Sequence, residues 1–439
     1  MRHIIKNFET LASSELRKQA LLIAEAGFEA ISTQAAVTKN FLFDAKKQEL
    51  KIFQEKFAIG QYKRIVCIGF GKAALEAVTA IQQILKDRIT CGYVLDLKEG
   101  SLGNIICRVG THPLPTKVNI EATKELVNML EACGAEDLVI CVVSGGGSAL
   151  LCKPHDMSCE TEVSLISALT VKGANIRELN TVRKHISSVK GGNLAKIIYP
   201  ATCISLIFSD VPGDDISMVA SGPTVKDTTT NRDAGEILRK YDVLTMCELP
   251  SCKLLETPKE EKYFKNIHNI LFVSAKQALL AMSERAEELG YEVKIFSSAF
   301  QGEAGVLVKE ILSQAKKGQC LLGAGESTVK IKAPIRLGSG RLSGEGKGGR
   351  NQEMALVALS TIKNNQVLLC LASDGRDNTE AAGAVADVNV VDRAKVLSLS
   401  PEKFLANNDS FTFFEKLGET VITGPTGANV SDFFVMLEQ

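Results

Sequence analysis

Short apolar runs that end in glycine- or aspartate-rich loops recur along the chain. Six runs of this kind end at Ile68, Val143, Phe208, Leu322, Leu371 and Ile422. Their length and their branched side chains predict buried strands of a largely parallel sheet, because both strand faces are apolar. Ligands of parallel α/β sheets bind outside the carboxyl ends of the strands. With three such ends in each half, the pattern predicts two α/β domains whose loop edges face a shared cleft.

Helical patterns alternate with these strands. Residues 8–32 carry an apolar stripe at helical spacing. Further helices are predicted at 118–132, 160–172, 275–289, 302–315 and 351–362. The segment 248–266 fits neither pattern, since it contains two prolines and many charges. We therefore predict that it joins two domains, one of residues 1–255 and one of residues 256–439.

Three consecutive glycines follow the strand that ends at Val143. This strand leads into Ser144, Gly145, Gly146, Gly147 and Ser148, and a helical pattern comes next. Glycines lack the Cβ that would hold a ligand away from the backbone, so their N–H groups and the following helix end can face one anion. Two interpretations stay open for this stretch alone: a cradle for a phosphate or carboxylate, and a tight turn that binds nothing.

Basic residues occur in two further places. Lys72 follows Gly71 where the first strand turns into a helix, so its ammonium group can reach an anion held by the backbone. The run GFGKAA lacks the third glycine of a dinucleotide fingerprint and the spacing of a Walker A loop. A second basic cluster consists of Arg183, Lys184, His185 and Lys190. Such a cluster either faces solvent or contributes to an anion site.

The richest basic stretch is 336–359. Six glycines alternate there with Arg336, Arg341, Lys347 and Arg350, and a helix begins directly afterwards. Backbone N–H groups, positive charge and a helix end together predict a polyanion site, against the alternative of a disordered basic loop.

Carboxylates gather in two loops that follow strands. They are Asp210, Asp214, Asp215, Asp374 and Asp377. Carboxylates that face phosphate-binding loops hold Mg²⁺ or accept a hydroxyl proton, and the alternative is a set of unpaired surface aspartates.

Composition narrows the class of protein. The 439 residues hold 51 Lys and Arg and 51 Asp and Glu, and this zero net charge argues against a general nucleic-acid or membrane-surface role. Aromatic residues are scarce and Trp is absent, so base-stacking platforms are not expected. The twelve cysteines form no C-x-x-C pair and many sit in apolar runs, which predicts unpaired buried thiols. With no signal-type segment and no membrane-length apolar run, we expect a cytoplasmic protein.

Several longer motifs together resemble the glycerate 2-kinase family, whose C-terminal portion is called the MOFRL domain. Some members of this family carry the label hydroxypyruvate reductase. The motifs are SGGGSALL, ELNTVRKHISSVKGGNLA, DVPGDD with ASGPT, GAGESTV, GKGGRNQE and GPTGANVSD, and the resemblance spans about residues 10–439. It implies an α/β fold with a Rossmann-like N-terminal domain, a second α/β domain of the MOFRL type and an active site in the cleft between them.

The resemblance also implies ATP- and Mg²⁺-dependent phosphorylation of D-glycerate at its 2-hydroxyl, which gives 2-phosphoglycerate. The family's essential lysine matches Lys72, its DVPGDD aspartate matches Asp214 and its GGRNQE arginine matches Arg350. Three stretches depart from the usual family pattern. They are HPLPTK at 112–117, SDGRDNT at 373–379 and a longer loop at about 333–345. Because these stretches lie near the expected cleft, the identity of the hydroxy acid stays open.

We assign Lys72 and Arg350 to the substrate carboxylate and the transferring phosphoryl group. Asp214 is assigned to the attacking hydroxyl or to Mg²⁺, with Asp374 as the second metal candidate. Nucleotide or substrate anions are assigned to Ser144–Ser148, Lys190 and the 338–349 loop with Gly348 and Gly349. The expected partners are ATP and D-glycerate, without nucleic acid or membrane, and a homo-oligomer is left open.

Three alternatives remain at this point. An NAD(P)-dependent hydroxypyruvate reductase would use GFGKAA and Asp96, which lies at a suitable distance for a ribose contact, but the third glycine is missing. A kinase of a related small hydroxy acid would need the same residues as the glycerate kinase. A non-catalytic anion sensor would not need Lys72, Asp214 and Arg350 together.

Overall fold

The computed structural model describes residues 3–211, 213–247, 249, 251–331 and 346–439. These residues form two compact units. The central unit, as we call it, comprises the described part of residues 33–211 and 215–272. The terminal unit carries both ends of the chain and comprises the described part of residues 3–32, 213–214 and 273–439.

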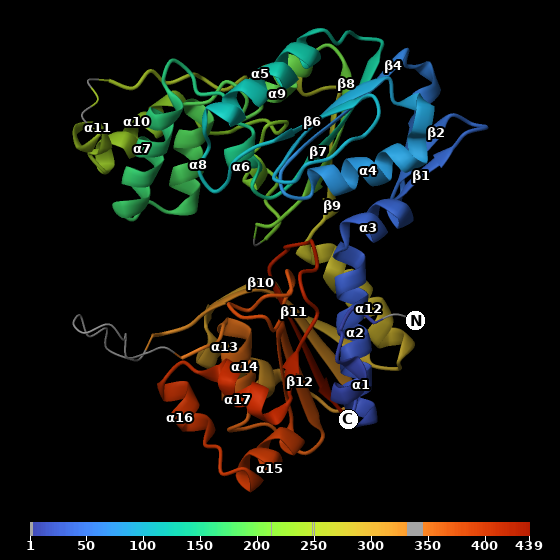
Figure 1. Cartoon of the computed structure of the whole chain (residues 1–439), viewed down its shortest axis with the longest axis vertical. Helices are drawn as coiled ribbons and strands as arrows, with labels where there is room; N and C mark the ends of the chain where they lie inside the picture. The colour runs from blue at the N-terminus through green and yellow to red at the C-terminus, as the bar shows by residue number, and fades with distance from the viewer. Residues whose placement is uncertain (1–2, 212, 248, 250, 332–345) are drawn as a thin grey trace. The chain divides into compact units, whose positions relative to one another are not determined.

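The central unit is built on a six-stranded sheet in the order β6-β5-β4-β7-β8-β9 (Figure 1). The five strands from β6 to β8 run parallel. The strands are β4 (Arg64–Phe70), β5 (Cys91–Asp96), β6 (Ile105–Val109), β7 (Asp137–Val143), β8 (Thr202–Phe208) and β9 (Ile267–Val273). The direction in which the sequence crosses the sheet reverses at the β4–β7 pair. A ligand site is therefore expected outside the carboxyl ends of these two strands.

Both faces of this sheet are buried, as the apolar runs predict. All seven residues of β7 are buried. One face packs against α5 (Lys117–Glu131) and α9 (Asn193–Ile198), where Ile68, Leu126 and Ile198 belong to one apolar cluster. The other face packs against α4 (Ala74–Leu85), and a Cβ on Gly69 would lie 2.9 Å from Cγ2 of Val78. The absence of a side chain at Gly69 lets this helix approach closely.

Smaller elements complete the central unit. The helices α7 (Cys159–Val171), α8 (Ile176–His185), α10 (Asn231–Lys240) and α11 (Val243–Met246) share an apolar cluster of their own. After α3 (Thr33–Asn40), the strands β1 (Phe41–Asp44), β2 (Glu49–Ile52) and β3 (Glu55–Ala58) form an antiparallel sheet. The short elements are α6 (Gly147–Leu150), η1 (Ile59–Gln61), η2 (Lys86–Arg88), η3 (Val219–Ser221) and η4 (Glu261–Tyr263).

The terminal unit has a mixed six-stranded sheet in the order β10-β11-β15-β12-β13-β14. The strands are β10 (Glu292–Glu303), β11 (Gln319–Thr328), β12 (Gln366–Ala372), β13 (Gly383–Ala386), β14 (Thr420–Val421) and β15 (Asp432–Glu438). β15 is antiparallel to β11 and β12, and β13 is antiparallel to β12 and β14. The strands β11, β12 and β14 therefore point the same way. Their carboxyl ends, and the loops predicted to follow them, meet at one edge of the sheet.

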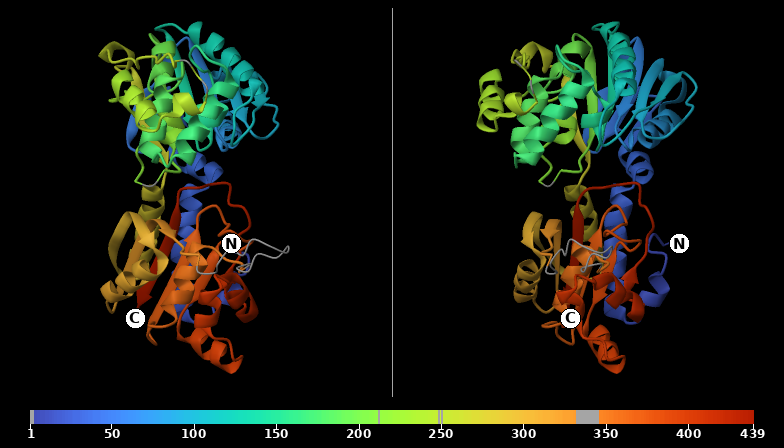
Figure 2. Two further views of the ribbon diagram at one scale, coloured as in Figure 1. Left: turned by 90° about the vertical axis from the view of Figure 1, so that its left-hand side faces the viewer. Right: turned by 60° about the vertical axis from the view of Figure 1, so that its left-hand side comes forward.

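Helices cover both faces of this second sheet (Figures 1 and 2). On one face α2 (Glu15–Ile31) packs along α12 (Ala275–Glu288). On the other face α13 (Ala304–Gln314), α14 (Arg350–Ala358) and α17 (Ser410–Leu417) share an apolar cluster with the sheet. The remaining helices are α1 (Phe8–Leu11), α15 (Val388–Val396) and α16 (Pro401–Ala406).

The compact units differ from the predicted domains 1–255 and 256–439 at the N-terminus. Helix α2 packs against α12, β12 and β15, all in the terminal unit. Its buried Arg17 forms ion pairs with Asp387 and Glu419. Hydrophobic periodicity predicts that a helix packs against an apolar surface, but not which surface. For this helix the partner surface comes from the opposite end of the chain.

The segment 248–266, predicted to join two domains, packs into the central unit where the structure describes it. The N–H of Leu255 donates to the carbonyl of His185 at 2.7 Å, and the Thr257 hydroxyl donates to buried Asp227 at 3.2 Å. The chain passes between the units at residues 32–33, 211–215 and 272–273. The described part of this segment therefore belongs to the central unit.

The main correction to the predicted elements concerns GAGEST. This stretch continues strand β11 to Thr328 instead of forming a loop after Leu322. Pairing with β10 and β15 on both sides keeps it extended, and a Cβ on Gly325 would lie 2.2 Å from the carbonyl oxygen of Phe300. The strands β1–β3, β6, β13 and β15 were not predicted.

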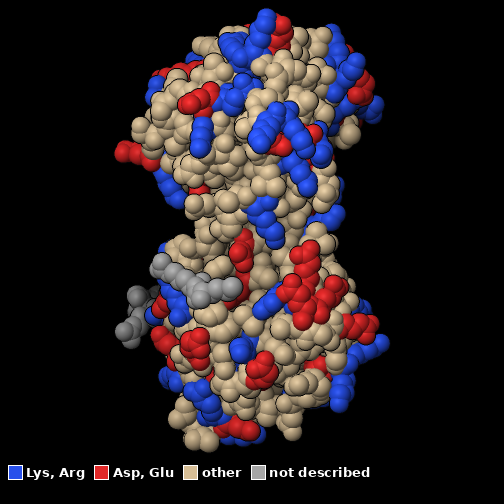
Figure 3. Space-filling view, turned by 90° about the vertical axis from the view of Figure 1, so that its right-hand side faces the viewer, with Lys and Arg blue, Asp and Glu red and all other residues tan. Residues whose placement is uncertain are grey.

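All twelve cysteines are unpaired. No single helix among the described residues is long and apolar enough to cross a bilayer, and one bent pair, α2 with α3, passes that test by length and composition only. Basic and acidic side chains are interspersed over the face in Figure 3, in keeping with the zero net charge.

Candidate active site

The predicted site residues fall into two sets, one on each unit. The set on the central unit is Lys72, Ser144, Gly145, Gly146, Gly147, Ser148 and Lys190. The set on the terminal unit is Asp214, Gly348, Gly349, Arg350 and Asp374. Lys72, Ser144–Ser148 and Asp374 lie just beyond the carboxyl ends of β4, β7 and β12, where ligands of α/β sheets bind.

Lys72 follows β4, at the reversal of strand order between β4 and β7. Its backbone N–H donates to the carbonyl of Gly145 at 2.9 Å, which ties the loops after these two strands together. Gly71 makes this approach feasible, because its φ is +119° and a Cβ would lie 2.1 Å from the Ser144 hydroxyl oxygen. The Lys72 side chain is exposed, so its ammonium group can meet an anion outside the sheet.

Ser144 and Ser148 are engaged within the protein. Ser144 is buried, and its hydroxyl accepts a hydrogen bond from the N–H of Ala73 at 3.2 Å. The Ser148 hydroxyl lies 3.1 Å from that of Ser221. In this loop, Ser144 ties the glycine run to the start of α4, and the Ser148 hydroxyl faces that of Ser221.

Gly145 and Gly146 allow three functional side chains to lie against one loop. A Cβ on Gly145 would lie 2.3 Å from Oδ2 of Asp210. A Cβ on Gly146, which has a φ of +79°, would lie 3.1 Å from Cε of Lys72 and 3.2 Å from Cδ2 of His112. A carboxylate, an ammonium group and an imidazole thus converge on the predicted anion loop, while Gly147 begins α6.

His112 was not among the predicted site residues. The signal that could have pointed to His112 is its place in HPLPTK, one of the three stretches that depart from the usual family pattern. Partial burial and the neighbouring charge of Lys72 lower the pKa of His112. Its imidazole is therefore neutral at neutral pH, and can donate or accept a hydrogen bond without adding charge.

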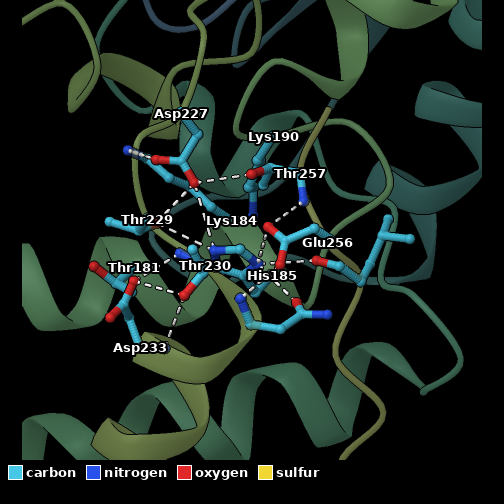
Figure 4. A network of polar contacts seen from close by, with 12 residues as sticks. Thr181, Lys184, His185, Lys190, Asp227, Thr229, Thr230, Asp233, Glu256 and Thr257 are labelled. Carbon is cyan, nitrogen blue, oxygen red and sulfur yellow. Dashed lines mark hydrogen bonds and ion pairs between the residues drawn. The ribbon is translucent and has the colours of Figure 1, made fainter. Parts of the chain in front are cut away.

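Lys190 and most of its basic cluster are buried and paired. Figure 4 shows Lys184 and His185 beside Asp227. The Lys190 ammonium group lies 3.0 Å from Glu162. Lys184 donates to Asp227 at 3.0 Å, and His185 lies 3.5 Å from the same carboxylate. Burial alone would raise the pKa of Asp227, but the hydrogen bond from His185 and the charge of Lys184 hold it well below its usual range. The charges of Lys184, His185 and Lys190 are therefore balanced by carboxylates inside the protein and not by a ligand.

Arg350 begins α14 and is held by two acidic side chains. Its guanidinium makes a two-pronged contact with Asp432, through Nε and through Nη2, and Nη2 also lies 3.1 Å from Glu326. The arginine is partly exposed, whereas Asp432 is buried. Burial raises the pKa of Asp432 to about 7, although hydrogen bonding to Arg350 works in the opposite direction. Asp432 belongs to the GPTGANVSD motif but was not predicted as a site residue.

A cavity of about 440 Å³ adjoins Arg350 in the terminal unit. Asp374, Asp377, Asp432 and Ser327 also line it. Asp377 is buried and accepts hydrogen bonds from two N–H groups at the start of α14, so it supports the helix. Asp374 is partly exposed. The buried Ser327 hydroxyl has no hydrogen-bond partner among the described residues.

Gly348 and Gly349 lie where close packing requires glycine. A Cβ on Gly348 would lie 2.2 Å from the Ser410 hydroxyl oxygen, and a Cβ on Gly349 would lie 2.2 Å from Oδ1 of Asp377. The part of the predicted anion loop that precedes Gly346, with Arg336 and Arg341, lies outside the described residues. The two glycines therefore shape the start of α14 and the approach to Arg350.

Asp214 and Asp215 behave differently. Asp214 has a φ of +56° and accepts a hydrogen bond at 3.4 Å from the N–H of Lys276, in the first turn of α12. Asp215 accepts hydrogen bonds from the backbone N–H and the hydroxyl of Ser217, at 3.0 and 2.7 Å. Asp215 therefore stabilises a turn at the start of the following segment.

No group of three or more His, Cys, Asp or Glu side chains is arranged to hold a metal ion in the part of the chain that the structure describes. Mg²⁺ in phosphotransferases is usually held by one or two carboxylates, with phosphate oxygens and water completing the shell. Asp374 at the cavity of the terminal unit has the right donor chemistry for that arrangement, and so has Asp214 at the start of α12.

Asp96, the candidate ribose contact of a reductase, is occupied. It is buried, and its carboxylate accepts hydrogen bonds from the N–H groups of Leu75, Leu97 and Lys98 at 2.9, 2.6 and 3.2 Å. An aspartate that binds a ribose needs its carboxylate oxygens for the ribose hydroxyls. Here these oxygens stabilise the start of α4 and the end of β5.

Sequence comparisons match both units. The profile of a domain of unknown function, DUF4147, matches residues 19–256, and that of the MOFRL family matches residues 319–432. D-glycerate 2-kinase of Thermotoga maritima is 34% identical over 391 residues, which cover 85% of this chain and 90% of that protein. Glycerate 2-kinase of Pyrococcus horikoshii is 36% identical over 403 residues, covering 85% and 87%. An Agrobacterium vitis relative with the provisional name hydroxypyruvate reductase is 35% identical over 393 residues, covering 85% and 87%.

Two solved structures share the fold along nearly the whole chain. The crystal structure of glycerate kinase from Thermotoga maritima superposes with a TM-score of 0.82 at 29% identity, covering 97% of this chain and 100% of that one. A Pyrococcus horikoshii protein superposes with a TM-score of 0.84 at 32% identity, covering 96% and 98%.

Proposed function

Because the chain belongs to the glycerate 2-kinase family, we propose that it transfers the terminal phosphoryl group of ATP to the 2-hydroxyl of D-glycerate and so forms 2-phosphoglycerate. One observation carries the proposal. Lys72, the glycine loop and His112 meet at the reversal of strand order in the central unit, where α/β sheets bind their ligands.

Phosphoryl transfer needs positioning and charge neutralisation more than covalent help from the protein. The exposed ammonium group of Lys72 supplies positive charge beside Gly145 and Gly146. Backbone groups can approach an anion there without obstruction from a Cβ. Lys190 acts from below the surface, because it neutralises Glu162 and keeps that carboxylate from repelling an anion.

We assign the second half of the chemistry to residues of the terminal unit. Arg350, held by Asp432 and Glu326, carries positive charge for the transferring group or the substrate carboxylate. The substrate 2-hydroxyl oxygen forms the new bond to phosphorus, the bond from phosphorus to ADP breaks, and the hydroxyl proton passes to a carboxylate. Asp214 is our choice for that carboxylate and Asp374 is the second candidate.

Mg²⁺ is the expected companion of ATP, and it supplies charge neutralisation of the phosphates when bound. Asp374 and Asp214 are the residues that we propose to hold it. For the nucleotide we propose the Rossmann-like sheet of the central unit, since the order of its parallel strands reverses beside the glycine loop. Unpaired thiols throughout the chain support a reducing compartment, for which we propose the cytoplasm.

The test is a coupled assay of the purified protein with D-glycerate, ATP and Mg²⁺, with the phosphorylated position identified by NMR. We expect ADP formation that depends on D-glycerate, and 2-phosphoglycerate as the product. The same preparation should not oxidise NADH or NADPH with hydroxypyruvate, since Asp96 is engaged by backbone N–H groups. NAD(P)H turnover without ATP would refute the kinase proposal and indicate a reductase. 3-Phosphoglycerate as the product would show that the acceptor is the 3-hydroxyl and not the 2-hydroxyl.

A further inference from the structure

A second cavity lies beside the glycine loop, entirely within the central unit. Its volume is about 280 Å³, below the range of about 300–1,000 Å³ typical of sites for drug-sized ligands. Three parts of the unit form its walls: the turn at 112–115, the loop and helix start at 146–149, and the facing helices α7 and α8. Its size suits a small molecule better than a whole nucleotide.

The polar residue that distinguishes this cavity is Arg183. It is partly buried on α8, and burial lowers its pKa, an effect that the charge of Glu162 offsets in part. Among the described residues no side chain makes an ion pair or hydrogen bond with Arg183. The neighbouring cations Lys184 and Lys190, in contrast, are each paired with a carboxylate. An arginine without a partner in a desolvated wall favours binding of an anion from outside.

Glu162, which also lines the cavity, does not fill this role. One of its oxygens lies 3.0 Å from the Lys190 ammonium group, and the other accepts a contact from the Cys152 thiol at 3.5 Å. Its negative charge is therefore neutralised inside the protein. The net charge that the cavity presents to a ligand comes from Arg183.

The other walls suit a short hydroxylated chain. His112 is neutral at neutral pH and Ser148 carries a hydroxyl, so both can bond to substrate hydroxyl groups. Leu114 and Ile166 provide apolar surface, which lowers the local dielectric and strengthens an ion pair. Gly146 in the cavity wall lies against the side chain of Lys72, so the cavity is next to the proposed catalytic lysine.

We propose that this cavity binds the hydroxy-acid substrate and that Arg183 is the ion-pair partner of its carboxylate. The inference rests on the proposed function, because it takes the substrate to be a small acid such as D-glycerate. It assigns the carboxylate to Arg183 in place of Lys72 and Arg350, which are left for the phosphoryl group.

The test compares Arg183→Met with wild type and with Arg177→Met as a matched control. Arg177 is exposed at the start of the same helix, so its replacement removes the same charge away from the cavity. We expect Arg183→Met to raise KM for D-glycerate roughly 10- to 100-fold, the effect of losing hydrogen bonds to a charged group, and to change KM for ATP less than about twofold. Arg177→Met should match wild type in both constants.

A binding measurement that needs no turnover tests the assignment of Arg183 independently. D-glycerate alone should raise the melting temperature of wild type and of Arg177→Met, and this shift should be lost in Arg183→Met. Glycerol, which has hydroxyls but no carboxylate, should bind or react equally poorly with all three proteins. If Arg183→Met does not fold, Arg183→Lys serves in its place, with a smaller rise in KM for D-glycerate and the same unchanged KM for ATP.

Unchanged constants for D-glycerate in the Arg183 variants, with an active wild type, would refute the assignment and leave the kinase proposal intact. A rise in KM for ATP without a rise in KM for D-glycerate would also refute the assignment, and would indicate that the cavity binds the nucleotide. If wild type neither binds nor phosphorylates D-glycerate, the proposed function fails first and the inference fails with it.

Discussion

Replacing Asp432 by Asn should remove a pH dependence of stability that originates in one buried carboxyl group. Burial raises the pKa of Asp432 from its ordinary value of 3.8 to about 7, and hydrogen bonds from Arg350 reduce this effect without cancelling it. Between these two values the folded protein keeps a proton that the unfolded chain has lost. The stability that this group contributes is therefore fully present below pH 3.8 and is lost as the pH rises through about 7.

The magnitude follows from the difference in bound protons. Each pH unit inside the window lowers the free energy of unfolding by about 1.4 kcal/mol. From pH 5 to pH 8 the wild-type protein crosses about two such units and loses up to about 3 kcal/mol through Asp432. Asn has nearly the same volume and does not titrate, so the variant lacks this loss. Its contact with Arg350 does not titrate either, so any change in that contact shifts the stability of the variant by the same amount at every pH.

Urea unfolding of both proteins between pH 5 and pH 8 measures the difference. The free energy of unfolding of Asp432→Asn minus that of wild type should change by at least about 1 kcal/mol across this range, in favour of the variant as the pH rises. Glu326→Gln is the matched control, because it removes the other carboxylate beside Arg350 at 3.1 Å and leaves Asp432 in place. Its curve should run parallel to that of wild type. A parallel curve for Asp432→Asn would refute the reasoning, since no titrating group would then have been removed.

Four further outcomes are expected. Lys72→Met should lower kcat roughly 10²-fold without changing the melting temperature, because the side chain is exposed; a near-normal kcat would demote Lys72 to a surface lysine. Asp214→Asn should lower kcat strongly, whereas Asp215→Asn should cost about 1 kcal/mol of stability or less, since Asn also caps turns; the reverse pattern in paired kinetic and melting measurements would exchange the two roles. Gly349→Ala should destabilise by about 1–3 kcal/mol in urea unfolding, because its Cβ would lie 2.2 Å from a buried carboxylate, while Gly305→Ala, with nothing within 4 Å, should be neutral or slightly stabilising. Reducing agents should leave the melting temperature unchanged, because all twelve thiols are unpaired.

The sequence predicted the strands of both sheets best where an apolar run ended in a polar loop. The runs up to Val143 and Phe208 form β7 and β8, which pair in parallel and are almost entirely buried, as expected for apolar runs inside a parallel sheet. The pattern could not show that β15 lies between β11 and β12, or that α2 packs on that same sheet. Both facts depend on pairings between distant parts of the chain. Local periodicity carries no information about such pairings.

The candidate site was predictable to a similar degree. Loop chemistry after strands identified Lys72, the glycine run and Arg350, since each stands next to a clear strand or helix signal. Asp432 was missed because its role comes from Arg350, which is distant in sequence and meets it only in the folded sheet. His112 was missed for the same reason, since the loop that it faces follows a different strand.

The basic cluster on α8 shows why residue type alone could not assign roles. Arg183 and Lys184 are adjacent in the sequence, but neighbours on a helix point about 100° apart, so they face different surroundings. Lys184 forms an ion pair with Asp227, a residue that follows β8 in the sequence. The charge of Lys184 is therefore balanced inside the protein. Arg183 faces the cavity beside the glycine loop, with no carboxylate of the described chain within ion-pair distance. Whether a cation stabilises the fold or binds a ligand is therefore decided by the acid that reaches it, and for Arg183 we propose that this acid is the carboxylate of a substrate.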